Sequence, residues 1–199
     1  MQIDTDHLHY WMQAIRQSPD PIRTMDAFWR GQLQSKEWLI ETLTMHLGIT
    51  CGSYDIDIYG GWVGVLASML FQSTIPVSKI RSIDIDPACE KIASMMNKGE
   101  EMQGRFTAIS ADMCSSISNA GIVINTSCEH ITQSQYQQWL DLMPKNCLLV
   151  LQSNNYAIDE HVRIAESLEE FNSQCSINVM WMGQLELPLY TRWMVIGNK

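Results

Sequence analysis

The residues best suited to ligand chemistry stand directly after apolar runs rich in Ile and Val. The first run leads into Gly60, Gly61 and Gly64, and a helical pattern follows. Glycine lets the backbone approach a ligand closely, and the start of a helix offers free N–H groups and a positive dipole end. The segment therefore predicts a binding loop, although a tight strand-to-helix turn without a ligand has the same requirement.

Later apolar runs also end in polar residues. Asp84 follows the glycines by roughly 25 residues, and a carboxylate so placed can accept hydrogen bonds from both hydroxyls of a ribose. Asp86 precedes Pro87 and is the better candidate for a helix N-cap. Asp112 and Asn125 end the next two runs. Parallel strands finish at one edge of a sheet, so we expect these side chains to meet there in a ligand site.

Glu129 and His130 follow the fourth run, and His130 is the candidate for proton transfer. An imidazole titrates near neutral pH and suits a general base, but a histidine that only caps or packs on the next helix is an equal alternative. Side chains of adjacent residues diverge on a regular helix or strand, so we expect no metal site. Asn154, Asn155 and Tyr156 follow the fifth run, either as acceptor contacts or as an Asn-rich turn.

The positions of these runs predict the elements that hold them. Short Ile- and Val-rich runs that alternate with helical patterns are typical of a mostly parallel sheet with crossover helices. We expect parallel strands at residues 54–59, 80–84, 106–110, 121–125 and 147–152. We expect crossover helices at residues 63–71, 87–97 and 132–142, the last of them capped by Thr132.

The C-terminal part of the chain departs from this alternation. After the fifth strand we expect a helix at residues 159–171. Strands at residues 177–187 and 192–197 follow, and a short turn at Pro188 makes this pair antiparallel.

The first 50 residues differ from the rest of the chain in their sequence pattern. They show helical periodicity and carry Trp11, Trp29 and Trp38. We expect residues 1–50 to form a helical extension of a ligand-binding domain at residues 51–199. Such an extension either packs on the sheet or forms a lid over the site.

Residues from about 55 to 152, together with the terminal strand pair, resemble the class I S-adenosylmethionine-dependent methyltransferases. The resemblance rests on the glycine loop, the acidic strand ends and the polar end of the fourth strand. It implies an α/β, Rossmann-like three-layer sandwich whose mostly parallel seven-stranded sheet has an antiparallel last strand. The end hairpin separates this topology from a nicotinamide-binding Rossmann domain. The implied cofactor is S-adenosyl-L-methionine, and the implied reaction is methyl transfer.

The resemblance assigns the first loop to the methionine part of the cofactor. The implied contacts come from Asp57, Tyr59, Gly60, Gly61, Trp62 and Gly64. The usual family loop has glycines at alternate positions, but here Tyr59 and Val63 occupy two of these positions, and Gly60 and Gly64 fall one residue late. We therefore expect a variant path in which Tyr59 stacks near the cofactor or narrows its pocket.

The resemblance assigns the adenosine part of the cofactor to the later strand ends. It implies that Asp84 binds the ribose hydroxyls and that Ile85 packs on the adenine. It also implies that Asp112 accepts from the exocyclic amine, with Met113 alongside, and that Asn125 lies below the sulfonium.

The resemblance extends to the acceptor side of the site and leaves alternatives open. The Glu129-His130 pair resembles the Glu-His pair of some small-molecule methyltransferases, which implies that His130 is the base. An aminocarboxypropyl transferase would use the same cofactor with a repositioned methionine end. A non-catalytic module would keep the fold and bind a protein partner, and a nicotinamide oxidoreductase is a third alternative.

Composition limits the partners and the compartment. The net charge of −9, with Lys and Arg scattered along the chain, disfavours duplex nucleic acid and favours a small-molecule or protein acceptor. The six cysteines contain no CxxC pair, so we expect reduced, buried thiols. No apolar run approaches the roughly 20 residues of a membrane-spanning helix, and the first residues lack a signal pattern. We therefore expect a cytoplasmic protein.

Overall fold

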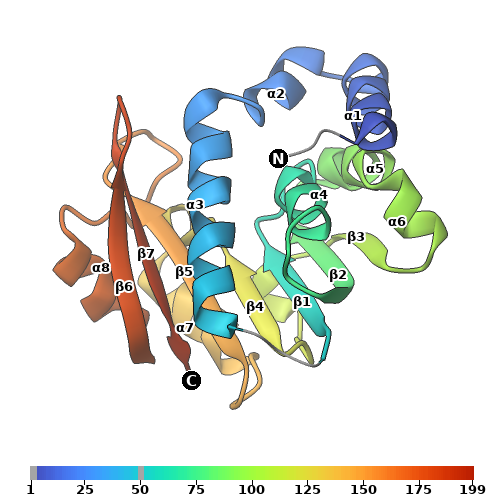
Figure 1. Cartoon of the computed structure of the whole chain (residues 1–199). Helices are drawn as coiled ribbons and strands as arrows, with labels where there is room; N and C mark the ends of the chain where they lie inside the picture. Colours follow the sequence, from blue (N-terminus) through green and yellow to red (C-terminus); the bar gives the residue numbers. More distant parts are fainter. Residues whose placement is uncertain (1–3, 49–51) are drawn as a thin grey trace.

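The computed structural model describes residues 4–48 and 52–199, and a seven-stranded sheet runs through its centre (Figure 1). The strand order is β3-β2-β1-β4-β5-β7-β6. Strands β1 to β5 are parallel to one another, whereas β7 runs antiparallel between β5 and β6. The predicted fold class is therefore confirmed. The strands are β1 (Tyr54–Tyr59), β2 (Val77–Asp84), β3 (Phe106–Ser110), β4 (Ile122–Asn125), β5 (Leu148–Asn154), β6 (Asn178–Glu186) and β7 (Thr191–Asn198).

Helices cover both faces of this sheet and complete three layers (Figure 1). Helices α3 and α4 pack on one face, and α7 and α8 pack on the other. The α-helices are α1 (Thr5–Gln17), α2 (Pro21–Asp26), α3 (Arg30–Leu47), α4 (Val65–Phe71), α5 (Pro87–Met96), α6 (Lys98–Met102), α7 (Gln133–Asp141) and α8 (Leu168–Cys175). The 3-10 helices in the described part of the chain are η1 (Met113–Ser115) and η2 (Cys128–His130).

Side-chain alternation along β1 divides the core between these two faces. Ile56 and Ile58 belong to the apolar cluster under α3 and α4, whereas Tyr59 belongs to the cluster under α7. Successive side chains of a strand point to opposite faces, so neighbouring residues of one short strand serve different layers. This alternation decides which β1 residues can reach a ligand.

The N-terminal helices pack on the sheet and its crossover helices. Leu39 and Leu43 of α3 are fully buried in the same cluster as Ile58, while Ala14 of α1 packs with Ile92 and Met96 of α5. Of the two arrangements expected for the extension, packing on the sheet is the one observed for α3. Within residues 4–48 and 52–199, no helix is both long and apolar enough to cross a membrane.

The expected helix at 159–171 is wrong. Residues 155–166 form a loop, and the helix α8 begins only at Leu168, after the N-cap Ser167 accepts a hydrogen bond from the Glu170 amide at 3.1 Å. Several loop amides donate to distant acceptors: those of Val162 and Arg163 donate to the Glu129 carbonyl, at 2.9 and 3.0 Å. Tertiary hydrogen bonds therefore override the helical pattern of this segment.

Other expected boundaries need smaller changes. Thr132 caps α7 in a reciprocal capping box with Gln135, as predicted for the N-cap. The predicted helix at 87–97 ends at Met96, and the short helix α6 that follows it was not predicted. Strand β2 begins at Val77, three residues before its predicted start at residue 80.

Candidate active site

A pocket of about 590 Å³ opens at the edge where the parallel strands end. The predicted residues that line it include Gly60, Gly61, Trp62, Asp84, Ile85, Asp112, Met113, Glu129 and His130. The carboxyl ends of parallel strands converge at this edge, so residues distant in sequence share one cavity. The structure brings these residues together around one pocket. The predicted residues that lie outside the lining are Asp57, Tyr59, Gly64 and Asn125.

The glycine loop follows a path that few other residues permit. Gly60 has φ +67°, and a Cβ atom on it would lie 2.1 Å from the Ser127 hydroxyl oxygen. A Cβ atom on Gly61 would lie 2.0 Å from the hydroxyl oxygen of Ser82. Trp62 has φ +47°, a left-handed conformation that is costly for a bulky side chain. The loop therefore takes a variant path, with a tryptophan in a conformation that glycine adopts freely.

Asp84 connects the glycine loop to the end of β2. Its Oδ2 accepts a hydrogen bond from the Trp62 amide at 2.8 Å, and its Oδ1 accepts from the Asp86 amide at 3.0 Å. Each carboxylate oxygen can accept a second hydrogen bond, so the group remains able to bind a ligand hydroxyl. Asp86 caps α5 by accepting from the Ala88 amide at 2.9 Å, as predicted, and it pairs with Arg23 of α2 at 2.5 Å.

Asp57 and Tyr59 lie on the opposite face of β1 from the pocket. Asp57 is buried, and its carboxylate accepts hydrogen bonds from Arg81 Nε at 2.7 Å and from the Ser118 hydroxyl at 2.6 Å. The fully buried Tyr59 hydroxyl donates to the Ser116 carbonyl at 2.9 Å, and burial raises the pKa of this phenol. Strand alternation turns Ile58 toward the pocket instead. The expected position of Tyr59 beside a cofactor therefore does not match this arrangement.

Gly64 and Asn125 support the site from behind its lining. Gly64 has φ +81°, and its carbonyl accepts a hydrogen bond from Asn97 Nδ2 at 3.0 Å. Asn125 is fully buried, and its Oδ1 accepts from the Ser127 amide at 3.0 Å. Both residues fix the turns that carry lining residues.

Glu129 and His130 lie in the 3-10 turn η2, where the expected divergence of their side chains is not observed. An oxygen of Glu129 and a ring nitrogen of His130 lie within 4.8 Å of each other. The turn η2 is only three residues long and is followed by extended backbone at Ile131, so the two side chains do not follow the geometry of a long regular helix or strand. Glu129 Oε1 accepts from Asn154 Nδ2 at 2.6 Å and from Arg192 Nη1 at 2.8 Å.

Asn154 and Asn155 have structural partners. Asn154 donates to Glu129, as described above, and Asn155 Oδ1 accepts from the Thr191 amide at 2.8 Å. These contacts support the interpretation of this segment as a turn, not as a group of acceptor contacts.

Two lining residues that were not predicted from the sequence come from α3 and β7. Lys36 of α3 and Arg192 of β7 line the pocket, and the Lys36 Nζ donates to Gln32 Oε1 at 2.8 Å. Burial, with a smaller contribution from the Arg192 charge, lowers the pKa of Lys36 to about 7. No local motif marks either residue, because only tertiary packing brings α3 and β7 to the strand ends.

Free cysteines occur among the described residues, in agreement with the predicted reduced thiols. Cys89, Cys128, Cys147 and Cys175 are buried. Cys114 is only half-buried and lines the pocket, which differs from the expected burial. Cys51 lies outside the described residues.

Comparisons with known proteins indicate the fold. No protein-family model matches the chain, and no curated protein matches its sequence. Among solved structures, magnesium protoporphyrin IX methyltransferase from Synechocystis PCC 6803, with bound SAH, aligns with a TM-score of 0.66 at 11% identity. That alignment covers 98% of this chain and 94% of the other.

Two further structures show the same likeness. A putative RNA methyltransferase from Pyrococcus horikoshii aligns with a TM-score of 0.62 at 15% identity, and the alignment covers 98% of each chain. Mitomycin 7-O-methyltransferase aligns with a TM-score of 0.60 at 13% identity over 95% of this chain and 60% of that enzyme. The chain therefore has the fold of the class I S-adenosylmethionine-dependent methyltransferases.

Proposed function

We propose that the protein is an S-adenosylmethionine-dependent methyltransferase that acts on a small-molecule or protein acceptor. The observation that carries the proposal is the position of Asp84 beside the glycine loop, in a pocket at the strand ends of a methyltransferase fold. The pocket volume of about 590 Å³ lies within the usual range for small-molecule sites. When bound, S-adenosylmethionine supplies an activated methyl group.

The lining residues fit the cofactor in chemistry as well as in volume. The Asp84 carboxylate retains acceptor capacity for the ribose hydroxyls after its two backbone hydrogen bonds. Ile85 is 71% exposed and lies in the lining with Met113, so both offer apolar surface to the adenine. The exposed Asp112 carboxylate supplies an acceptor for the exocyclic amine, while its Oδ1 also accepts from the Cys114 amide at 2.8 Å.

The acceptor would occupy the end of the pocket that α3 and β7 border. Lys36, Glu129, His130 and Arg192 line this end, so a polar acceptor finds both donors and acceptors there. Direct displacement at the sulfonium depends mainly on alignment, and a base is needed only for a protonated acceptor. The overall charge of −9 opposes binding of duplex phosphates.

Two residues are candidates for that base. The sequence prediction is His130, whose Nδ1 lies 3.2 Å from the Glu160 carbonyl oxygen, so a backbone carbonyl orients its ring. Lys36 is the second candidate, because a lowered pKa of about 7 makes its neutral amine available near physiological pH. Glu129 does not orient His130 through Oε1, because Asn154 and Arg192 occupy that oxygen.

Calorimetric titration with S-adenosylmethionine and S-adenosylhomocysteine tests the proposal. We expect binding by the wild-type protein and a loss of about 1.5 to 3 kcal/mol in Asp84→Ala, since a charged hydrogen-bond acceptor is removed. Asp55→Ala is the matched control, because Asp55 is exposed near the opposite end of β1. The control should bind both ligands like the wild type.

The products of turnover separate the remaining alternatives. Methyl transfer releases S-adenosylhomocysteine, whereas transfer of the aminocarboxypropyl group releases methylthioadenosine. Binding that Asp84→Ala leaves unchanged would remove the proposed ribose contact. Absence of binding by the wild-type protein would contradict the proposal and favour a partner-binding module with this fold.

A further inference from the structure

The loop between β5 and α8 is fastened to the turn η2 beside the pocket. The Glu129 carbonyl accepts hydrogen bonds from the amides of Val162 and Arg163, at 2.9 and 3.0 Å. These bonds join the two segments at Glu129, next to His130 in one segment and His161 in the other. These hydrogen bonds therefore bring the carboxylate of Glu129 close to the imidazoles of His130 and His161.

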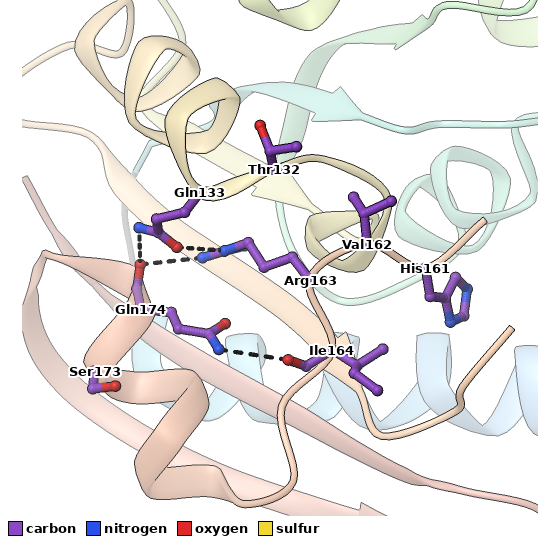
Figure 2. Close-up of a pocket in the computed structure, with 8 residues that line it drawn as sticks. All are labelled: Thr132, Gln133, His161, Val162, Arg163, Ile164, Ser173 and Gln174. Atoms are coloured by element: carbon purple, nitrogen blue, oxygen red, sulfur yellow. Dashed lines mark hydrogen bonds between the residues drawn. The ribbon is translucent and has the colours of Figure 1, made fainter. Parts of the chain in front are cut away.

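Arg163 fixes this loop through several independent contacts (Figure 2). Its guanidinium donates to Gln133 Oε1 at 2.7 Å and to the carbonyls of Cys128 and Gln174, each at 3.1 Å. It also lies 4.1 Å from the ring centroid of Tyr136. Figure 2 shows the ring of His161 directed away from this Arg163 cluster. Arg163 thus determines the backbone position of His161 without using the imidazole.

Each imidazole contacts a backbone carbonyl through Nδ1. His130 Nδ1 lies 3.2 Å from the Glu160 oxygen, and His161 Nδ1 lies 2.6 Å from the Tyr156 oxygen. A carbonyl can only accept, so in each neutral ring Nδ1 carries the proton and Nε2 has a free lone pair. This is the arrangement in which histidine binds metals, with a second hydrogen bond fixing the tautomer.

Glu129 supplies a buried carboxylate oxygen that is unpaired among the residues that the structure describes. The residue is 3% exposed, and Oε1 is hydrogen-bonded to Asn154 and Arg192. Oε2 is buried and has no hydrogen bond to any residue of the described ranges 4–48 and 52–199. A buried carboxylate oxygen without a partner is energetically unfavourable, and a bound cation would relieve that cost.

We propose that Glu129, His130 and His161 bind one divalent transition-metal cation. Their candidate ligand atoms all lie within 4.8 Å of one another. Bonds of about 2.0 to 2.2 Å hold two ligands of one ion at most about 4.4 Å apart, so a small rotation of the rings closes the site. His130 is exposed and His161 is half-buried, so a cation can reach both rings.

The ligand types select the kind of cation. Two imidazoles and one carboxylate favour Zn²⁺, Co²⁺ or Fe²⁺ over Mg²⁺ and Ca²⁺, which prefer sites made of oxygen atoms. Arg192 already pairs with Glu129 at 2.8 Å, so the site adds little net negative charge. We therefore expect the imidazoles to provide most of the affinity.

The site has a consequence for catalysis that rests on the proposed function. Glu129 and His130 line the pocket, so the cation would lie at its wall, where an acceptor could reach it. A cation there lowers the pKa of a bound hydroxyl group, which favours an oxygen acceptor. His130 would then serve as a ligand and not as the base.

Metal binding is measured on the tag-free, full-length protein after treatment with a chelator. Co²⁺ is the probe, followed by its visible absorption and by calorimetry, and Zn²⁺ competes for the same site. We expect saturable binding of one Co²⁺ per chain, weakened at least about 10-fold in His161→Ala and in His130→Ala. His9→Ala is the matched control, because His9 is an exposed histidine on α1.

Thermal unfolding of each variant checks that the fold is retained. Wild-type protein that binds no Co²⁺, or His161→Ala protein that binds it as tightly as His9→Ala, would overturn the proposal. The metal-binding result does not depend on the S-adenosylmethionine titration, because that titration uses a different variant, Asp84→Ala. Binding of the metal without binding of the cofactor would support the metal site and contradict the proposed function.

Discussion

Lys36 lies where α3 meets the pocket, with its ammonium group hydrogen-bonded to Gln32 and under the field of Arg192. Burial favours the neutral amine and lowers the pKa of Lys36 from 10.5 to about 7. In the unfolded chain the same group keeps its proton up to about pH 10.4. Between these two values the unfolded state binds more protons than the folded state, so this group makes the folded state more stable as pH rises.

We therefore expect Lys36→Met to change the pH dependence of unfolding. At pH 6, the folded state must hold a charged ammonium in a partly buried position, and the variant should be more stable than the wild type. The difference should shrink as pH rises from about 7 toward 10.4, because the wild-type amine is then neutral when folded. Urea unfolding of both proteins at several pH values measures this difference in stability. Parallel stability curves for the two proteins would show that Lys36 has an ordinary pKa.

The elements differ in how far the sequence predicts them. Asp84 and Gly61 could be placed at the site because a parallel sheet sends its strand ends to one edge. Lys36, Arg192 and His161 could not, since they come from a helix, an antiparallel strand and a loop outside the repeating βα pattern. Their positions depend on tertiary hydrogen bonds and packing that have no local signature in the sequence.

The loop between β1 and α4 stores backbone strain at Trp62, which has φ +47°. We expect Trp62→Gly to be more stable than Trp62→Ala by about 1 kcal/mol, because both variants lose the indole but only glycine is free of the left-handed penalty. At an ordinary helix or strand position the order would be reversed. Urea unfolding measures both variants. Equal stability, or a more stable alanine variant, would contradict a strained loop.

At the scale of the whole molecule, helix α3 and the sheet share one core. Leu39 and Leu43 of α3 are fully buried with Ile58 of β1 and Ile124 of β4. A detachable lid would bury little apolar surface against the sheet and would open at low free energy. The burial of α3 instead predicts that it unfolds together with the central strands.

Hydrogen exchange tests this cooperativity at the level of single peptides. We expect the slowest amides of α3 (Arg30–Leu47) and β4 (Ile122–Asn125) to have the same opening free energy, because both require global unfolding. S-adenosylhomocysteine at 100 times its dissociation constant should raise both values by about 2.7 kcal/mol, since the ligand binds only the folded state. Exchange of α3 at a much lower free energy than β4 would identify it as a lid that opens while the sheet remains folded.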